Sequence, residues 1–197
     1  MSVIEREFYN RPALEVARDL LGCRLVRVQS GQRLAGLIIE TEAYQGEDDL
    51  GCHASAGKTP RTEVMYGPPG HAYVYFTYGM HWLLNAVTSG KDTPAAVLIR
   101  AIYPVEGEAL MLKNRPYNAG KAGWMDGPAK LTQALAINGD FNTIDLCNQK
   151  GGLWIEPSAP VKDINVERTS RVGLNSVPEP WRSISWRFVV DQRALYG

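Results

Sequence analysis

The stretch LAGLIIETEAY, residues 34–44, is rich in Leu, Ile, Thr and Tyr, and Gly46 follows it closely. Branched and aromatic side chains that end near a turn-forming residue are typical of a β-strand, so we expect a strand here. Because side chains alternate along a strand, Glu40, Glu42 and Tyr44 would share one face, with neighbours on it about 7 Å apart. A carboxylate and an aromatic ring facing one cavity would suit hydrolysis of a bond beside a flat ring.

Two simpler interpretations compete with a functional one at this level. A pair of glutamates on a strand is more often a solvated face than a catalytic site. A second stripe, with Tyr73, Tyr75 and Thr77 on one strand face, is more often core, because aromatic and branched residues favour strands in general. Neither pattern establishes a site by itself.

Further strands and helices are expected around residues 34–44. Two segments should form a hairpin around a turn at Gly79, and other regular elements should flank it. The strands are expected at 71–77, 82–88, 95–102 and 183–190, the helices from Asn10 and Pro12 to Gly22 and from Asp126-Gly-Pro128 to Asn138-Gly139, a long loop at 46–70 and a polar connection at 113–127. This order predicts an α+β fold, a single domain over 1–197 with a mainly antiparallel curved sheet, a protruding hairpin and a few flanking helices.

Composition limits the classes of partner. The chain has 197 residues, is 45% hydrophobic, and carries 21 Lys plus Arg against 21 Asp plus Glu, so it lacks the overall positive field of many nucleic-acid binders. Any nucleic-acid contact must therefore come from a local patch. The first eleven residues hold no apolar segment, and no later run would cross a membrane, so we expect a cytoplasmic protein without a membrane partner.

Cysteines and histidines do not indicate a metal site or a disulfide framework. The cysteines are odd in number and include no Cys-x-x-Cys pair; they are Cys23, Cys52 and Cys147. The histidines do not show helix-borne His-x-x-x-His spacing when combined with Glu42, Asp48 and Asp49; they are His53, His71 and His81. We expect neither a metal nor a cofactor.

Motifs across nearly the whole chain resemble those of the alkyladenine, or 3-methyladenine, DNA glycosylase family, in family order. They are Glu40-Thr-Glu-Ala-Tyr44 with Gly46 and His53, Thr59-Pro-Arg61, Tyr73-Val-Tyr75, Tyr78-Gly-Met80, Asn85, Leu98-Ile-Arg100-Ala, the segment from Gly127 to Ile137, and Arg171-Val-Gly173. No single motif is decisive, but together they are specific. The resemblance favours the functional interpretation of both strand stripes.

The resemblance implies the catalytic roles. Glu42 would be the general base that activates water, and Arg100 would help to hold the site and the flipped nucleotide. Free glutamate titrates at about 4.3, so Glu42 would accept a proton at neutral pH. Glu40 is the competing candidate, but it stands farther from Tyr44 and is interpreted as structural. No lysine occupies the strand, so lyase activity is not expected.

The resemblance also implies a base pocket. Tyr44, His53 and Tyr75 would sandwich the extruded base, and alkylation makes a purine cationic, which aromatic faces favour by about 0.5–2 kcal/mol. Neutral lesions would instead need a hydrogen-bond donor, which the family supplies from the backbone at His53. Asn85 would obstruct the exocyclic amine of guanine.

Contacts with DNA are implied for a further set of residues. Tyr78 would enter the minor groove and fill the gap left by the flipped nucleotide. Met80, Thr59 and Arg61 would lie on the DNA side. Lys130, near the start of the second helix, is equally well interpreted as a phosphate ligand or as an ordinary exposed lysine. Three adjacent acids would repel DNA and are expected to point away from it; they are Glu47, Asp48 and Asp49.

The function that the resemblance implies is a monofunctional glycosylase that hydrolyses the N-glycosidic bond of damaged purines. Its substrates would be 3-methyladenine, 7-methylguanine, hypoxanthine and ethenoadenine in double-stranded DNA, bound by a monomer in a bacterial-type, nucleoid-associated setting. One alternative is a noncatalytic nucleic-acid-binding module, disfavoured because a pure binder needs no carboxylate beside the sugar. A metal-dependent hydrolase is the second, and loss of activity on chelation would indicate it.

Overall fold

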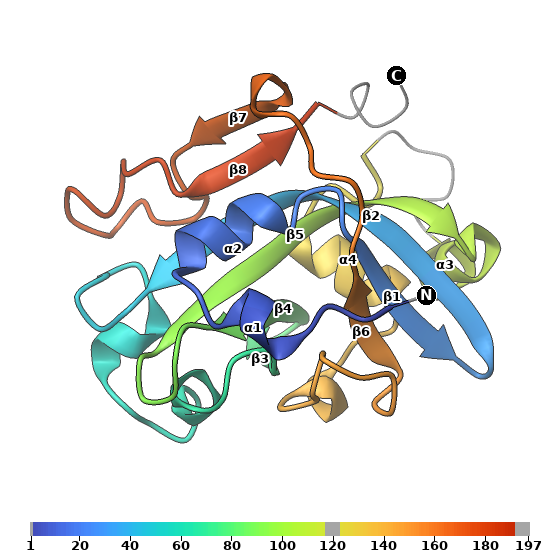
Figure 1. Cartoon of the computed structure of the whole chain (residues 1–197), viewed down its shortest axis with the longest axis horizontal. Coiled ribbons are helices and arrows are strands. Elements are labelled where there is room, and N and C mark those ends of the chain that lie inside the picture. Colours follow the sequence, from blue (N-terminus) through green and yellow to red (C-terminus); the bar gives the residue numbers. More distant parts are fainter. Residues whose placement is uncertain (1, 117–122, 192–197) are drawn as a thin grey trace.

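The computed structural model describes residues 2–116 and 123–191 of the chain (Figure 1). Its strands are β1 (Arg24–Gln29), β2 (Gln32–Gln45), β3 (Ala72–Thr77), β4 (His81–Thr88), β5 (Ala95–Glu106), β6 (Leu153–Glu156), β7 (Val166–Thr169) and β8 (Arg187–Val190). Its α-helices are α1 (Arg6–Tyr9), α2 (Ala13–Asp19), α3 (Glu108–Asn114) and α4 (Pro128–Ala134). Short 3-10 helices are η1 (His53–Ala56), η2 (Glu63–Tyr66), η4 (Gly139–Phe141) and η5 (Asp163–Asn165).

One sheet, in which the described strands all pair antiparallel, organises the fold. Its main path runs β3-β4-β5-β2-β1-β6, and β8 joins it by pairing with both β2 and β7. Along one edge β2 changes partner, from β1 at 32–37 to β8 at 40–42, while β5 follows its other edge with register shifts around Glu40. Such irregularities bend and twist a strand. The sheet therefore curls, and the predicted α+β class with a mainly antiparallel curved sheet is confirmed.

The alternation of β2 separates the scaffold from the pocket. Thr41 is fully buried, and its hydroxyl donates to the carbonyl of Ala17 in α2 over 2.7 Å. Glu42 and Tyr44 point to the opposite face, because successive side chains of a strand alternate. There the first residues of α4 border the pocket, and α4 packs on β4 and β5. Helix α2 thus packs against one face of β2, and the other face of β2 carries the polar groups of the pocket.

The predicted hairpin is confirmed as β3 and β4, joined by a tight turn. Tyr78 and Gly79 have φ values of +52° and +67°, in the left-handed region that glycine adopts readily and other residues only rarely. The turn raises its side chains into solvent: Tyr78 is 83% exposed and Met80 is 65% exposed. The hairpin therefore presents two large apolar groups at its tip.

Several predicted boundaries differ from the structure. Pro12 stands at the start of α2, and no side-chain cap, from Asn10 or any other residue, is made there; α2 ends at Asp19, before the left-handed Gly22. Helix α4 ends at Ala134, ahead of the predicted Asn138-Gly139. The last strand covers only 187–190 of the predicted 183–190, because the chain turns between Pro180 and Ile184. The predicted connection at 113–127 begins inside α3, and its residues 117–122 lie outside the described residues.

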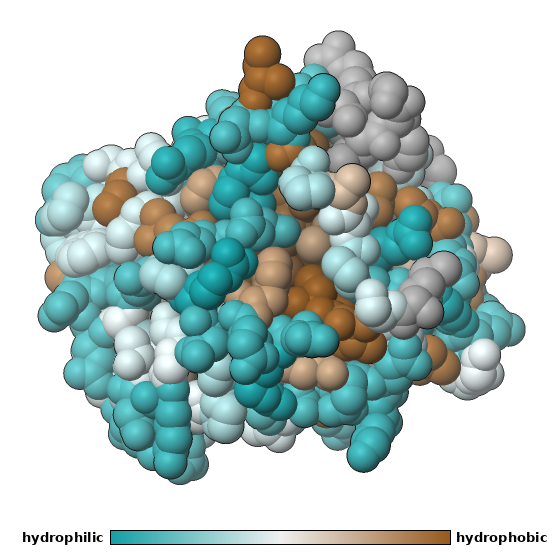
Figure 2. Space-filling view, viewed as in Figure 1, coloured by the Kyte–Doolittle hydropathy of each residue, from teal (hydrophilic) through white to brown (hydrophobic). Residues whose placement is uncertain are grey.

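The face of the molecule in Figure 2 is hydrophilic over most of its area, with hydrophobic groups gathered near its middle. Within the described part of the chain, no helix is both long and apolar enough to cross a membrane.

Candidate active site

Glu42 is the central polar group of the site and is fully buried. Its Oε1 accepts the backbone N–H of Val172 at 2.7 Å, and its Oε2 accepts the Tyr44 hydroxyl at 2.7 Å. Arg100 Nη1 lies 3.4 Å from the same Oε2. The solvated-face interpretation of this glutamate is therefore wrong.

The environment of Glu42 acts on its ionisation in two directions. Burial raises the pKa of Glu42 above its ordinary value, since desolvation penalises the charged form. The Arg100 charge, the Val172 N–H and the Tyr44 hydroxyl oppose this rise in the pKa, because each stabilises the carboxylate. The carboxylate is held by two hydrogen bonds and one ion pair, and its pKa is raised overall, which suits a group that accepts a proton.

Glu40 is also almost buried, but its partners differ. Its Oε1 accepts the Nε of Arg100 and the Nε of Arg187, each at 2.6 Å. Arg100 therefore bridges the two carboxylates, and Arg187 compensates the second charge. This arrangement fits the structural interpretation of Glu40, because the contacted oxygen is already shared between two guanidinium groups.

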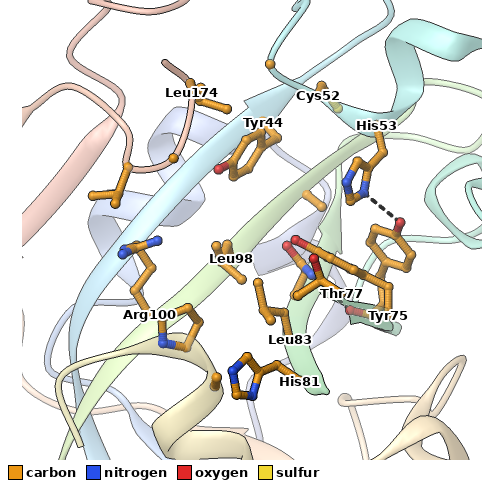
Figure 3. A pocket seen from close by; sticks show the side chains of 18 of the residues that line it. Tyr44, Cys52, His53, Tyr75, Thr77, His81, Leu83, Leu98, Arg100 and Leu174 are labelled. Carbon is orange, nitrogen blue, oxygen red and sulfur yellow. Dashed lines mark hydrogen bonds between the residues drawn. The ribbon is translucent and has the colours of Figure 1, made fainter. Parts of the chain in front are cut away.

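A pocket of about 330 Å³ opens in front of these carboxylates, within the range of about 300–1,000 Å³ that small-molecule sites occupy. Tyr44 and His53 lie at one end of it, and Arg100 and His81 lie at the other (Figure 3). Glu42 stands behind the wall, and three of the pocket's lining residues contact its carboxylate; they are Tyr44, Arg100 and Val172.

The aromatic residues make one wall of the pocket. The rings of His53 and Tyr75 meet edge to face with centroids 4.6 Å apart, and Tyr73 lies 5.2 Å from Tyr75. His53 Nδ1 and the Tyr73 hydroxyl form a 2.8 Å hydrogen bond. Burial and the nearby Arg61 lower the pKa of His53 to about 4. His53 is therefore neutral near pH 7 and adds no positive charge to the pocket.

Asn85 is buried in β4 and lines the same pocket. Its Nδ2 donates to the carbonyl of Tyr73 across the hairpin over 3.0 Å, which fixes the orientation of the amide. The predicted base-pocket residues are thus brought together around one cavity; they are Tyr44, His53, Tyr75 and Asn85.

Four of the residues predicted on the DNA side belong to two segments, the turn between β3 and β4 and residues 59–61. Tyr78 lies at the pocket while remaining exposed, and Met80 is exposed on the same turn. Arg61 stacks its guanidinium 4.9 Å from the Tyr75 ring. Thr59 shapes a turn by hydrogen bonds with Thr62.

Lys130 already has protein partners. It forms an ion pair with Asp126, four residues earlier in the chain, and donates to the carbonyl of Gly123 over 3.0 Å. A phosphate at Lys130 would have to compete with this acid, and its predicted contact with DNA stays a prediction.

Two of the three adjacent acids have partners inside the protein. Asp49 is fully buried and forms a two-point ion pair with Arg171, at 2.5 and 2.8 Å. Glu47 accepts the Tyr66 hydroxyl over 2.5 Å. The acidic run therefore places at least one of its charges in the interior.

Sequence reasoning did not assign a role to several site residues. Arg171 appeared only as part of a motif, and Arg187 only within a predicted strand. His81 was weighed only as a metal ligand, yet it lines the pocket, and its buried Nδ1 has no partner among the residues described. The sequence held no signal for Arg187, because its place opposite Glu42 and its ion pair with Glu40 depend on the pairing of β2 with β8. Across 2–116 and 123–191, no three His, Cys, Asp or Glu residues cluster as metal ligands would.

The site combines a buried carboxylate with a cavity walled by tyrosines on a curled antiparallel sheet, an arrangement suited to hydrolysis of a bond beside a flat, aromatic group. Comparison with known proteins makes this specific. The chain matches the family model for methylpurine-DNA glycosylase over residues 7–194, and it belongs to that family. It is a DNA glycosylase, an enzyme that hydrolyses the bond between base and sugar in base excision repair.

Curated relatives with the name "Putative 3-methyladenine DNA glycosylase" are similar over most of their length. The protein of Methanocella arvoryzae is 48% identical over 186 residues, which cover 92% of each chain. That of Carboxydothermus hydrogenoformans is 48% identical over 174 residues, 88% of this chain and 90% of the relative. That of Herpetosiphon aurantiacus is 42% identical over 203 residues, 99% of this chain and 89% of the relative. The resemblance seen in the motifs is confirmed, and a noncatalytic binding module is not the function of the chain.

Proposed function

We propose that this enzyme flips alkylated or deaminated purines out of double-stranded DNA and hydrolyses their N-glycosidic bond. The substrates are 3-methyladenine, 7-methylguanine, hypoxanthine and ethenoadenine, and one chain acts on one lesion. A single observation carries this proposal: the buried Glu42 carboxylate contacts three groups that line an aromatic-walled pocket. A base held in that pocket would place its sugar near the groups around Glu42.

The reaction assigns one task to each group. Glu42 accepts a proton from water, the water oxygen bonds to C1′ of the sugar, and the bonding electrons to the base nitrogen leave with the base. Arg100 stabilises the Glu42 carboxylate and holds Glu40 in place. A cationic purine departs as a neutral base, so no acid is needed, whereas a neutral lesion requires a proton on the leaving base.

Charge supports the choice of cationic lesions. A cation over an aromatic face gains about 0.5–2 kcal/mol, and the pocket offers Tyr44 and Tyr75. A guanidinium already lies over each ring, Arg171 at 4.7 Å from Tyr44 and Arg61 at 4.9 Å from Tyr75, so a cationic base would use the remaining face of each. The depressed pKa of His53 keeps that ring uncharged at neutral pH, so it does not repel a cationic base. His53 is the first residue of η1, so its N–H is not used by the hydrogen bonds within the helical turn, which fits a backbone donor for neutral lesions.

Release of a cationic lesion should lose rate as pH falls through the pKa of Glu42. Only the carboxylate accepts a proton, and burial raises this pKa, so the midpoint of the acidic limb of the pH–rate profile should lie above the ordinary glutamate pKa. Single-turnover release of 7-methylguanine, measured from about pH 4 to pH 8, checks this expectation. A limb at or below the ordinary glutamate value would contradict the desolvated environment.

Selection against guanine should depend on Asn85. Its amide is fixed by the Tyr73 carbonyl, so a guanine amine would clash with it or stay unpaired, at a cost of about 1–3 kcal/mol. Asn85→Ser should raise excision of undamaged guanine relative to hypoxanthine by about fivefold or more, the effect of 1 kcal/mol or more. The hypoxanthine rate serves as the internal control for folding. An unchanged ratio of the two rates would remove Asn85 from this role.

Duplexes that each carry one defined lesion test the proposed function. Free base should appear from each of the four lesions and far more slowly from undamaged purines, with or without a chelator. If free base appears from none of the four lesions, the proposed substrates are overturned. Loss of activity on chelation would favour a metal-dependent hydrolase.

A further inference from the structure

Behind the pocket, Arg171 and Asp49 form an ion pair whose two side chains have no exposed surface. The pair is bidentate, because Nη1 and Nη2 of Arg171 contact different oxygens of Asp49. The same nitrogens donate to the carbonyls of Ala43 and Trp181, at 3.1 and 3.2 Å. A planar guanidinium with this many acceptors has a fixed position, because its donors form a rigid fork.

Asp49 fixes one flank of the pocket. Its carboxylate accepts the backbone N–H of Gln45, at the end of β2, and that of Gly51, at 3.3 and 2.9 Å. Its own carbonyl accepts the N–H of Cys52 over 2.8 Å. Gly51, Cys52 and the next residue, His53, all line the pocket. The ion pair therefore fixes the segment 49–52, which places His53 at the pocket.

Arg171 fixes a second set of groups at the pocket. It directly precedes Val172, whose N–H donates to Glu42 Oε1 over 2.7 Å and whose side chain lines the pocket. The Arg171 guanidinium also lies between two rings, 4.7 Å from the centroid of Tyr44 and 5.1 Å from that of Trp186. The positions of Tyr44 and of the Val172 N–H that donates to Glu42 thus both depend on Arg171.

We infer that Arg171, locked by Asp49, is a positioning residue of the reaction that fixes Tyr44 and the Val172 N–H against Glu42. It does not line the pocket, so it acts through these neighbours. This inference rests on the proposed role of Glu42 as the base. A merely structural pair would contribute stability and leave the ionisation of Glu42 unchanged.

A change in the pH profile separates these two roles. The Val172 N–H lowers the pKa of Glu42, so a loosened contact lets that pKa rise further. The base is then protonated over a wider range, and the acidic limb of base release moves to higher pH. Arg171→Lys keeps the charge but loses the fork, and it should move the midpoint upward by about one pH unit, a tenfold loss on the acidic limb. The rate of base release by Arg171→Lys should recover as pH rises above the shifted midpoint.

A second variant, Gly51→Ala, displaces the Arg171 guanidinium without changing a charge. The backbone of Gly51 lies outside the left-handed region, but a Cβ there would stand 2.8 Å from Arg171 Nη2 and 2.8 Å from Leu174 Cδ1. Gly51→Ala should therefore displace the guanidinium and move the midpoint in the same direction. It carries the test if Arg171→Lys does not fold.

The matched control is Arg33→Lys. Arg33 pairs with the buried Glu156 at 2.7 Å, and neither residue lines the pocket. This variant should lose stability but keep the wild-type midpoint. All three variants and the wild type are compared by single-turnover release of 7-methylguanine across the acidic limb, with thermal melting measured in parallel.

The outcomes are distinct. Arg171→Lys decides the test if it folds, and Gly51→Ala decides it if Arg171→Lys does not fold. An upward shift of the midpoint in the deciding variant, absent in Arg33→Lys, supports the inference. An unshifted midpoint in the deciding variant, or an equal shift in Arg33→Lys, overturns it while the proposed function stands. Failure of the wild type to release the base would instead overturn the proposed function.

Discussion

Replacing Glu42 by glutamine is expected to reduce base release by about 10²- to 10⁴-fold, the usual contribution of a general base. The amide keeps the size of the side chain, and its oxygen still accepts a hydrogen bond from either the Tyr44 hydroxyl or the Val172 N–H. It cannot accept a proton from water. The variant should therefore bind lesion-containing duplexes as the wild type does, because the pocket lining is unchanged.

Single-turnover release with saturating enzyme, together with a binding titration, measures the two effects separately. Glu40→Gln is the matched control, because Glu40 is the other buried carboxylate that contacts Arg100. We expect it to lose stability and far less rate. Near-normal turnover in Glu42→Gln would contradict the assignment and make Glu40 the next candidate.

Replacing Tyr78 by alanine is expected to slow release from a well-paired lesion by on the order of 10- to 100-fold. Extrusion of a paired nucleotide costs a few kcal/mol, and a side chain that fills the gap offsets part of that cost. Tyr78 is suited to this task because it is 83% exposed at the hairpin tip and also borders the pocket. A bulged lesion has already lost pairing and stacking, so its release should change little.

The deciding comparison is hypoxanthine opposite thymine against hypoxanthine in an unpaired bulge, for wild type and Tyr78→Ala. Phe76→Ala is the control, since Phe76 is a half-exposed aromatic of the same hairpin that packs on Trp82 and does not line the pocket. It should not distinguish the two substrates. An equal slowing of both substrates by Tyr78→Ala would mean that Tyr78 supports the pocket and does not act as a wedge.

The sequence predicted the centre of the fold because local patterns there agree with tertiary structure. Alternation along β2 placed Glu42 beside Tyr44, and their hydrogen bond confirms the shared face. A turn was predicted at Gly79, and Tyr78 and Gly79 both have the left-handed backbone of a tight turn. The predicted base-pocket residues were far apart in sequence but meet around one cavity. Their roles in the reaction remain predictions.

Other elements were not predicted because their signals are short or depend on tertiary contacts. Strand β1 was missed, although Ser30 and Gly31, both with positive φ, make the tight turn that leads into β2. Strands β6 and β7 have four residues each, too few for a clear period. Asp49 looked like part of a surface acidic run, and only its distant partner Arg171 explains its burial. Such pairs are set by the fold and leave no local pattern.

The most direct test of hydrolysis by this site is the product of a single turnover. Wild-type enzyme is mixed with a duplex that carries one 7-methylguanine, and free base, strand integrity and borohydride-trapped enzyme are followed together. Water activated by Glu42 should give one free base per duplex, an intact abasic strand and no trapped complex. Strand cleavage with a trapped covalent complex, or no free base at all, would contradict the account.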